Sequence, residues 1–358
     1  MSSPTPKSFP GTEIQQIDER FEHAGLKRSQ RGTASGVPLR IRLERSAQLE
    51  LIPAAPLPRI APNGVQWLAV PAWEKMTWLW HGFSTRRGGL SQAYCTDDGP
   101  DKLGDLNLGF TAEDDRETVA QNRRLFAQAV SGDQATPIVD LHQIHSNLVL
   151  PACRSDARRK QPSNADGLMT DEPGLLLGIR TADCIPILVA DRKRRAVAAF
   201  HAGWRGTVQR IVESGIGRMR LQFGSRPEDL VAAIGPGIGT CCYAVGEEVL
   251  SSFESQFAYA RELFREVYDS DPVRNKYPLL FLTQRAPGHS EIGPSLHLNL
   301  VEANRRQLLA AGLKARAIHQ VGGCTSCHRE LFFSHRGSKG HAGRMMSVIG
   351  IRPDAAQH

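Results

Sequence analysis

The sequence lacks the features of several common classes of protein. No apolar run in its 358 residues approaches the roughly 18 residues that a membrane-spanning helix needs, so we expect no membrane partner. Only 6% of the residues are aromatic, and no stripe of Lys or Arg interleaved with aromatics accompanies the net charge of +7. We therefore expect no nucleic-acid partner. The basic cluster within Asp191–Arg195, between two apolar runs, predicts a solvated hairpin turn.

Signals for export and for disulfides are also missing. The chain starts with polar sequence that has neither an apolar stretch nor a small-residue cleavage site, which predicts a cytoplasmic protein. Seven cysteines, an odd number that includes the adjacent pair Cys241 and Cys242, do not form the pattern of a disulfide framework. Because thiols stay reduced in the cytoplasm, we expect free thiols or metal ligands.

The distribution of apolar residues predicts one main domain after an extension. Residues 1–63 are rich in Pro, Ser, Gly and charge and predict a mobile N-terminal extension, whereas dense apolar sequence begins near Val65, so residues 64–358 form the expected domain. Short apolar runs predict strands at Leu175–Ile179, Ile185–Val189, Ala196–Phe200, Leu230–Ile234 and Arg344–Ile351. Helix signals predict helices at Glu113–Val130, Arg205–Phe223 and Gly246–Phe257, and one that opens at Asn299.

Strands and helices alternate irregularly along this domain. This order favours an α/β fold with mixed β-sheets over a simple parallel winding, and we expect the helices to pack outside the sheets in α/β/β/α layers. Pro186 lies inside one of the predicted strands. Because proline cannot donate a ladder hydrogen bond, it predicts an edge strand or a bulge there.

Three short stretches place potential ligands at or near strand ends. They are HQIH, which ends at His145, TADC, which ends at Cys184, and HAGW, which begins at His201. Cys184 precedes one predicted strand and His201 closes the next, so a hairpin of about 16 residues would bring both side chains to one edge of a sheet. If His142 and His145 share a strand, their spacing places them on opposite faces, and one of them is structural.

The residue types at this edge allow three interpretations. A thiolate and two neutral imidazoles suit zinc, and a fourth position left open would make the site catalytic. The same side chains could form a Cys-His nucleophile pair, because an imidazolium lowers the pKa of a neighbouring thiol. They could also be ordinary core residues. The spacing alone leaves all three interpretations open.

Eight blocks occur in the order of a known family. They read HGFSTRRGGLS, LNLG, HQIHS, ADGLMTDEPGLLLGIRTADCIPIL, AAFHAGWRGTV, AIGPGIGTCCYAVGEEV, CTSCHRELFFSHR and GRMMSVIGI. From about Trp78 to Ile351 the chain resembles the laccase-domain family, whose members were first called polyphenol oxidases and are also called purine nucleoside phosphorylases or peptidoglycan editing factors.

The resemblance implies a metal site and a reaction. It implies zinc held by His145, Cys184 and His201, which would also be the catalytic residues, with copper as the less favoured metal. It implies phosphorolysis of adenosine, guanosine, inosine and methylthioadenosine, and deamination of adenosine, so the expected partners are purine nucleosides and phosphate. Ser146 stands where the family commonly has glycine, but the ligand before it is kept.

The implied chemistry also needs groups that bind phosphate and move protons. Arginine binds phosphate oxygens in pairs, and we expect Arg86 and Arg205 to bind substrate, with a structural salt bridge as the alternative for each. Known zinc deaminases of nucleobases use His-x-Glu followed by Pro-Cys-x-x-Cys, and neither element is present here. If deamination occurs, another group must move the proton. Asp183 is adjacent to the predicted thiolate ligand, but strand alternation could point it away.

The pentapeptide CTSCH, from Cys324 to His328, has the spacing that attaches a c-type haem. Covalent haem needs export, for which no signal is visible. A structural zinc needs four ligands, and Cys241 and Cys242 form the only other close pair. A redox pair normally opens a helix, whereas two glycines precede this one. The resemblance instead implies a loop that lines the pocket.

Two rival functions remain. A copper-dependent phenol oxidase would need paired His-x-His motifs, and the sequence contains none. A cell-wall editing hydrolase would use Cys184 as the nucleophile on a muropeptide amide. The sequence does not separate a monomer from a homodimer.

Overall fold

Two six-stranded sheets are the centre of the computed structural model, which describes residues 57–95, 104–267 and 295–354. The first sheet has the order β1 (Arg59–Ile60), β2 (Gln66–Leu68), β3 (Leu79–Ser84), β17 (Met345–Ile351), β9 (Leu176–Thr181), β6 (Ile138–Val139). The second has the order β16 (Ile318–Gln320), β12 (Leu230–Ile234), β10 (Ile185–Asp191), β11 (Val197–Ala202), β8 (Gly167–Thr170), β7 (Val149–Pro151). Both sheets are mixed, as predicted.

Smaller elements complete the domain. Strands β13 (Ala244–Val245), β15 (Ser295–Leu298) and β14 (Phe264–Val267) form one small sheet, and β4 (Arg87–Gly89) pairs with β5 (Gly104–Asp105). The α-helices among the described residues are α1 (Arg116–Ser131), α2 (Trp204–Val208), α3 (Ile211–Phe223), α4 (Glu247–Glu254) and α6 (Leu300–Ala310). Short 3-10 helices lie at Pro71–Trp73, Arg154–Arg158, Pro227–Asp229, Ala260–Leu263 and Ala315–Ala317.

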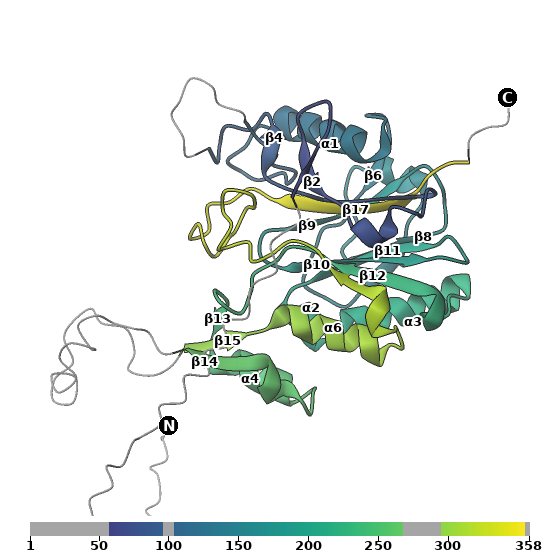
Figure 1. The fold of residues 1–358 in the computed structure, drawn as a ribbon. Helices are drawn as coiled ribbons and strands as arrows, with labels where there is room; N and C mark the ends of the chain where they lie inside the picture. Colours follow the sequence, from purple (N-terminus) through teal and green to yellow (C-terminus); the bar gives the residue numbers. More distant parts are fainter. Residues whose placement is uncertain (1–56, 96–103, 268–294, 355–358) are drawn as a thin grey trace, which may run out of the picture. The chain divides into compact units, whose positions relative to one another are not determined.

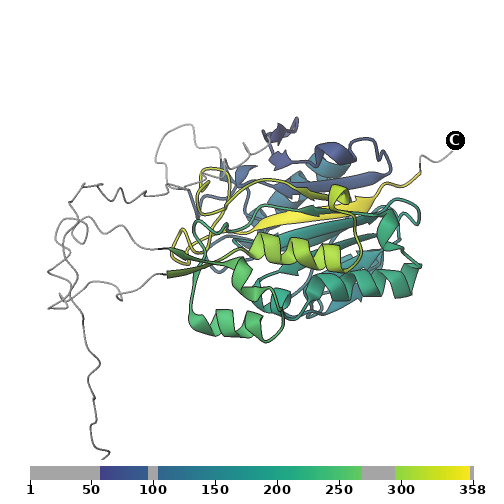
Figure 2. The same cartoon turned by 60° about the horizontal axis from the view of Figure 1, so that its bottom comes forward.

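The sheets lie face to face with helices outside, in the predicted α/β/β/α layers (Figures 1 and 2). Alternation along β10 explains the layers, because successive side chains point to opposite faces of a sheet. Leu188 belongs to the core between the two sheets, whereas Ile187 and Val189 belong to the core under α3 and α6. A third core joins Val348 of β17 to Phe126 of α1. Strands apolar on both faces therefore require cover on both sides.

Local signals place the ends of the elements. Asp115 accepts a hydrogen bond from the backbone N–H of Thr118 at 2.8 Å and caps α1, and Gly132 ends that helix in the left-handed conformation. The Asn299 side chain accepts from the backbone N–H of Glu302 at 3.0 Å and caps α6. These caps confirm the predicted opening at Asn299 and the predicted stop at Gly132, whereas α1 begins at Arg116, three residues after the predicted start at Glu113.

Two predictions about elements are wrong. The predicted helix at Arg205–Phe223 is two helices, because Arg210 adopts a left-handed backbone (φ 61°) between α2 and α3. The strand with Pro186 is neither an edge strand nor bulged, since β10 lies between β12 and β11 and pairs with both in continuous register. The backbone carbonyl of Pro186 accepts from the backbone N–H of Gly235, just after β12 ends. The Pro186 nitrogen, which has no proton to donate, therefore lies beyond the last ladder pair with β12.

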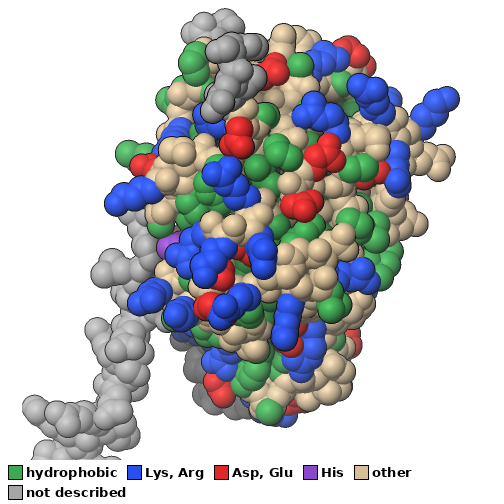
Figure 3. Space-filling view, turned by 90° about the vertical axis from the view of Figure 1, so that its right-hand side faces the viewer, with side chains coloured by type: hydrophobic (Ala, Val, Ile, Leu, Met, Phe, Trp, Pro, Cys, Tyr) green, Lys and Arg blue, Asp and Glu red, His purple; other side chains and the backbone are tan. Residues whose placement is uncertain are grey.

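The basic cluster after β10 forms the predicted hairpin turn. Asp191 is buried and accepts hydrogen bonds from the backbone N–H groups of Lys193 and Arg194 at 2.8 and 2.9 Å, and the basic side chains are exposed. On the face that Figure 3 shows, Lys and Arg side chains are interspersed with Asp and Glu. Among the described helices, none is long and apolar enough to cross a membrane.

The predicted extension falls mostly outside the described residues, which begin at residue 57. Strand β1 lies within the range 1–63, and its Arg59 pairs with Trp67 of β2. Asn63 also donates from its side chain to the backbone carbonyl of Leu125 in α1, at 2.9 Å. The boundary between residues 63 and 64 stays a prediction.

Candidate metal centre

His145, Cys184 and His201 meet at one end of the β10–β11 hairpin. Pro186 lies opposite His201 in the register of the hairpin, so Cys184, two residues earlier, is at the open end of the same pair of strands. His145 comes from the loop between β6 and β7. The candidate ligand atoms of the three residues lie within 4.8 Å of one another. The structure therefore brings together the three residues singled out from the sequence.

The geometry fits a single ion. The Cys184 sulfur is 3.9 Å from Nε2 of His145, and the two imidazole rings have centroids 4.9 Å apart. Zinc binds sulfur at about 2.3 Å and nitrogen at about 2.0–2.1 Å, and these two lengths together exceed the observed separation. One ion could thus reach both atoms. The Nδ1 atom of His201 is engaged elsewhere, which leaves its Nε2 as the third donor.

A buried carboxylate, Asp166, orients two of the three residues. It is fully buried and lies 2.8 Å from Nδ1 of His201. It also accepts from the backbone N–H groups of Ile144, His145 and Ser146 at 3.2, 3.0 and 2.6 Å. These bonds hold His145 in a left-handed conformation with φ 59°. A carboxylate behind a ligating imidazole is a common support of metal sites, which sequence reasoning missed here.

The electrostatics of the cluster favour a charged Cys-His pair. Burial opposes the ionisation of Cys184, but the charge of His201 and a hydrogen bond with His145 outweigh it and lower the pKa of the thiol to about 6. Burial likewise opposes the charge of His201, but Cys184 and Asp166 raise its pKa to about 9. Despite its burial, hydrogen bonds from His201 and Ser146 lower the pKa of Asp166 to about 2. A thiolate, which is the form that binds metal, is available at neutral pH.

The glycine of the HAGW block leaves space for the ligands. A Cβ atom at Gly203 would lie 2.9 Å from Cδ2 of His145 and 3.0 Å from the sulfur of Cys184. Contacts under 3.0 Å are essentially never seen for real Cβ atoms, so a side chain here would displace a ligand. Gly203 is a second functional position that sequence reasoning missed, although the block containing it was recognised.

Asp183 supports a neighbouring loop. Its backbone has φ 97°, and its buried carboxylate accepts from the hydroxyls of Thr325 and Ser334 at 2.6 and 2.7 Å and from the backbone N–H of Arg336 at 2.6 Å. These three donors occupy both oxygens of the carboxylate. The loop that contains CTSCH is thus attached beside Cys184. His142 is not in a strand with His145, because its only described strand-type pairing is an isolated bridge to Asn164.

Tyr243 belongs to the electrostatic surroundings of Cys184. Burial, and after it the negative charge of Cys184, raise the pKa of Tyr243 to about 12, although the positive charges of Arg336 and Arg205 oppose this shift. The guanidinium carbon of Arg336 lies 5.5 Å from the centre of the tyrosine ring. The phenol therefore stays protonated at neutral pH and can donate a hydrogen bond. No motif in the sequence pointed to it.

The two predicted substrate-binding arginines differ in their surroundings. Arg86 forms a largely buried salt bridge with Asp105, donates to the backbone oxygens of Tyr94 and Arg329, and stacks 4.7 Å from the ring of Phe333. These contacts favour the structural alternative for Arg86. Arg205 is exposed in α2, 4.5 Å above the ring of Trp204, and its charge acts on Tyr243 near Cys184. The geometry favours Arg205 for binding an anion.

Two other buried histidines, His81 and His297, are packing residues. His81 is buried, accepts at Nε2 from the backbone N–H of Val70 at 3.0 Å, and packs edge-on against Trp73. His297 is buried and its Nδ1 lies 2.6 Å from the carbonyl oxygen of Thr240.

Comparison with known proteins identifies the family. Residues 80–352 match the family described as multi-copper polyphenol oxidoreductase laccase. A purine nucleoside phosphorylase from Bacteroides thetaiotaomicron is 33% identical over 276 residues, which cover 76% of this chain and 91% of the relative. The adenosine deaminase RL5 from an unidentified prokaryote is 30% identical over 273 residues, 75% of this chain and 92% of the relative.

The fold is shared as well. The crystal structure of YlmD from Geobacillus stearothermophilus superposes with a TM-score of 0.63 at 32% identity, and the match covers 83% of this chain and 99% of that one. The resemblance seen in the eight sequence blocks is therefore confirmed over most of the described domain. The chain belongs to the multi-copper polyphenol oxidoreductase laccase family.

Proposed function

We propose that the chain is a zinc-dependent purine nucleoside phosphorylase that cleaves adenosine, guanosine, inosine and methylthioadenosine with phosphate and also deaminates adenosine. The observation that carries this proposal is the convergence of His145, Cys184 and His201, with Asp166 behind them. The names of the relatives support nucleosides as substrates. We also propose that it acts in the cytoplasm, where cysteine thiols stay reduced.

The three ligands would hold zinc and leave one coordination position open. Bound there, the ion supplies Lewis-acid polarisation of a substrate oxygen or of water. Asp166 accepts from Nδ1 of His201, so Nε2 is the nitrogen that would bind the ion after giving up its proton. Gly203 keeps the His145 ring and the Cys184 sulfur in place by leaving them space.

The remaining residues would serve the two substrates. In phosphorolysis a phosphate oxygen forms a bond to C1′ of the sugar while the bond from C1′ to the purine breaks, and the purine leaves with the electron pair. Arg205 would bind the attacking phosphate, because it is exposed and its charge lies near the site. Tyr243, protonated at neutral pH, would donate a hydrogen bond to the departing base.

An assay with inosine tests this function. We expect formation of ribose 1-phosphate and hypoxanthine that depends on added phosphate and that is lost in a Cys184→Ala variant. Arg205→Gln should raise the KM for phosphate more than it lowers kcat, whereas Arg218→Gln, on α3, serves as a control at another arginine. Cleavage at the same rate without phosphate, or full turnover in Cys184→Ala, would refute the proposal.

A cysteine hydrolase is the second candidate, because the lowered pKa of Cys184 beside the raised pKa of His201 is also the pattern of a nucleophile pair. Elemental analysis separates the candidates. Zinc supports the phosphorylase, copper would support a phenol oxidase, and fully active protein that contains no metal would support the hydrolase acting on muropeptides.

A further inference from the structure

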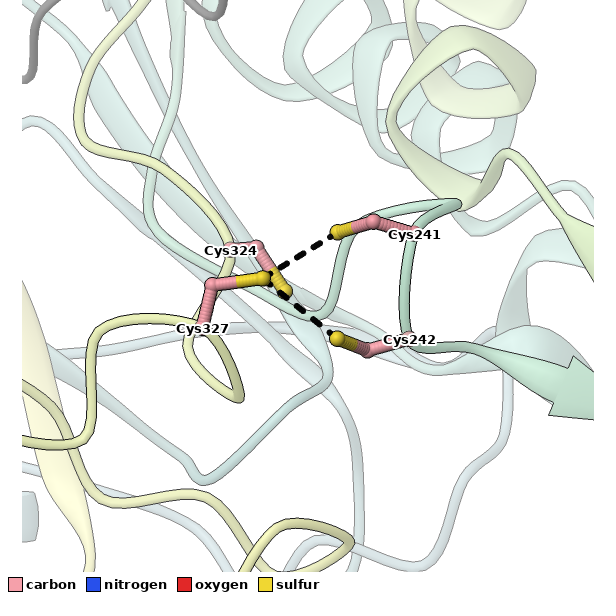
Figure 4. Close-up of side chains that lie close together, drawn as sticks. All are labelled: Cys241, Cys242, Cys324 and Cys327. Atoms are coloured by element: carbon pink, nitrogen blue, oxygen red, sulfur yellow. Dashed lines mark hydrogen bonds between the residues drawn. The ribbon is translucent and has the colours of Figure 1, made fainter. Parts of the chain in front are cut away.

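Four cysteines from two distant parts of the chain form a second cluster of thiols (Figure 4). Cys241 and Cys242 lie in the turn between β12 and β13, and Cys324 and Cys327 lie in the loop after β16. Their sulfur atoms are all within 4.8 Å of one another. None of the four belongs to the centre at His145.

The separations of the sulfur atoms fit ligands of one ion. The Cys327 sulfur lies 3.4 Å from the sulfurs of both Cys241 and Cys242 (Figure 4). All four thiols are free, and a disulfide would need its sulfurs at about 2.05 Å. Four thiolates at about 2.3 Å from one tetrahedral zinc ion are about 3.8 Å apart, which falls within the observed range.

Backbone contacts hold the two segments that carry the cysteines together without an ion. Gly237 pairs with Cys324 in an isolated bridge, and the backbone N–H of Thr325 donates to the carbonyl of Gly237 at 3.0 Å. The backbone N–H of Gly239 donates to the sulfur of Cys324 at 3.2 Å. An N–H group aimed at a sulfur favours the thiolate form, which is the form that binds metal.

Gly239 also allows the two loops to approach. A Cβ atom there would lie 3.1 Å from Cβ of Cys324 and 3.2 Å from the sulfur of Cys241, tighter than nearly all real contacts. Together these features hold four soft donors within 4.8 Å of one another, with Cys324 buried and Cys327 exposed. The exposed side gives an ion a path of entry.

We propose that Cys241, Cys242, Cys324 and Cys327 form a tetrathiolate site for one zinc ion, which is separate from the centre at His145. Binding would release the thiol protons to solvent and involve no oxidation or reduction. An iron-sulfur cluster would spread the cysteines further, because several irons and sulfides lie between the thiolates, so the close packing of the sulfurs favours a single ion.

Such an ion would fix the loop that supports the first centre. Thr325, between two of the proposed ligands, donates to Asp183, which precedes Cys184 in the chain. Closing four ligands around one ion joins the loop after β16 to the turn after β12. The site would therefore be structural, since four protein ligands leave no open position for a substrate.

Elemental analysis of full-length variants tests this site independently of the proposed function. The chain is purified under reducing conditions, from zinc-supplemented cells and without chelators. In a Cys184→Ala background, which removes a ligand of the first centre, we expect about one zinc per chain. Adding Cys327→Ser should remove that zinc, whereas adding Cys153→Ser, at an exposed cysteine elsewhere, should leave it.

Cobalt provides a second readout on folded protein. The Cys184→Ala chain loaded with Co²⁺ should show the strong sulfur-to-metal charge-transfer bands of a tetrahedral tetrathiolate site. Zinc content that does not change after Cys327→Ser, or a Co²⁺ spectrum without those bands, would overturn the proposal. Iron in place of zinc, or a disulfide at Cys327 in the freshly purified protein, would overturn it too. If only the first centre failed to bind zinc, the wild type would contain one zinc per chain and the Cys184→Ala variant would contain the same amount.

Discussion

Asp166 connects the candidate ligands more directly than any other side chain. Its two oxygens serve His201 and three successive backbone N–H groups that end at Ser146. An Asp166→Asn substitution replaces one acceptor oxygen by an NH₂ group that would face those donors. We expect zinc affinity to fall about 10–100-fold, measured by competition with a chelator, with a parallel loss of turnover.

Asp171→Asn is the matched control, because Asp171 is an exposed carboxylate in the turn after β8. It should leave zinc affinity unchanged. If Asp166→Asn bound zinc as tightly as this control, Asp166 would not be a support of the metal centre.

The buried His81 predicts how stability depends on pH. Burial, helped by the positive charge of Arg59, lowers the pKa of His81 from 6.5 to about 4, and Nε2 accepts from Val70 only when it is unprotonated. Between these two pH values the unfolded chain binds a proton that the folded chain does not. The free energy of unfolding should therefore decrease as the pH falls from 6.5 toward 4, by about 3 kcal/mol from this group.

Urea unfolding at several pH values measures this effect. A His81→Gln variant keeps an acceptor for Val70 but cannot titrate, so its stability should depend less on pH within that window. An equal loss of stability in wild type and variant between pH 6.5 and 4 would show that His81 is not the responsible group.

Single residues with a sequence signal were predictable, and those without one were not. His145, Cys184 and His201 each lie at or near the end of an apolar run, and the structure brings them together. Asp166 precedes a buried strand in the same way, and that signal could have identified it. Tyr243 had no such signal, because its role depends on a fold that brings distant charges toward it.

Packing between α3 and β11 rests on a small residue. A Cβ atom at Gly215 would lie 2.3 Å from the ring of the fully buried Phe200, whereas nothing lies within 4 Å of a Cβ atom at Gly217. We expect Gly215→Ala to lower the free energy of unfolding by about 1–3 kcal/mol through overpacking. Gly217→Ala should raise it by roughly 0.5–1 kcal/mol, because alanine favours a helix. Chemical unfolding measures both, and a change of the same sign in the two variants would contradict this account of the interface.

The order of strands and helices was largely readable from local patterns. Leu230–Ile234 is a strand with the predicted bounds, and the hairpin of β10 and β11 forms as predicted. The break at Arg210 was missed because a left-handed arginine between two helical stretches leaves no proline or glycine as a signal. Pro186 was misplaced at an edge because the neighbouring strand ends beside it, which is a property of the sheet and not of the strand.

The arrangement of the two sheets could be expected only in outline. Apolar strands covered on both faces imply layers, but the sequence does not say which strands become neighbours, such as β17 between β3 and β9. The same limit applies to the four clustered cysteines. Cys241 and Cys324 are far apart in the chain, and their loops meet through the bridge between Gly237 and Cys324 and the hydrogen bond from Gly239 to the Cys324 sulfur.

The architecture positions both proposed zinc sites near the start of β10. Cys184 lies at the start of that strand, and Asp183 next to it accepts from the loop that carries Cys324 and Cys327. The central claim is that one sulfur and two imidazole nitrogens at this point bind a single ion. X-ray diffraction from crystals of the zinc-loaded chain, recorded across the zinc absorption edge, tests it most directly. The account predicts an anomalous peak about 2.3 Å from the Cys184 sulfur and about 2.0–2.1 Å from nitrogens of His145 and His201. Crystals grown with zinc that show no peak among these three side chains would contradict it.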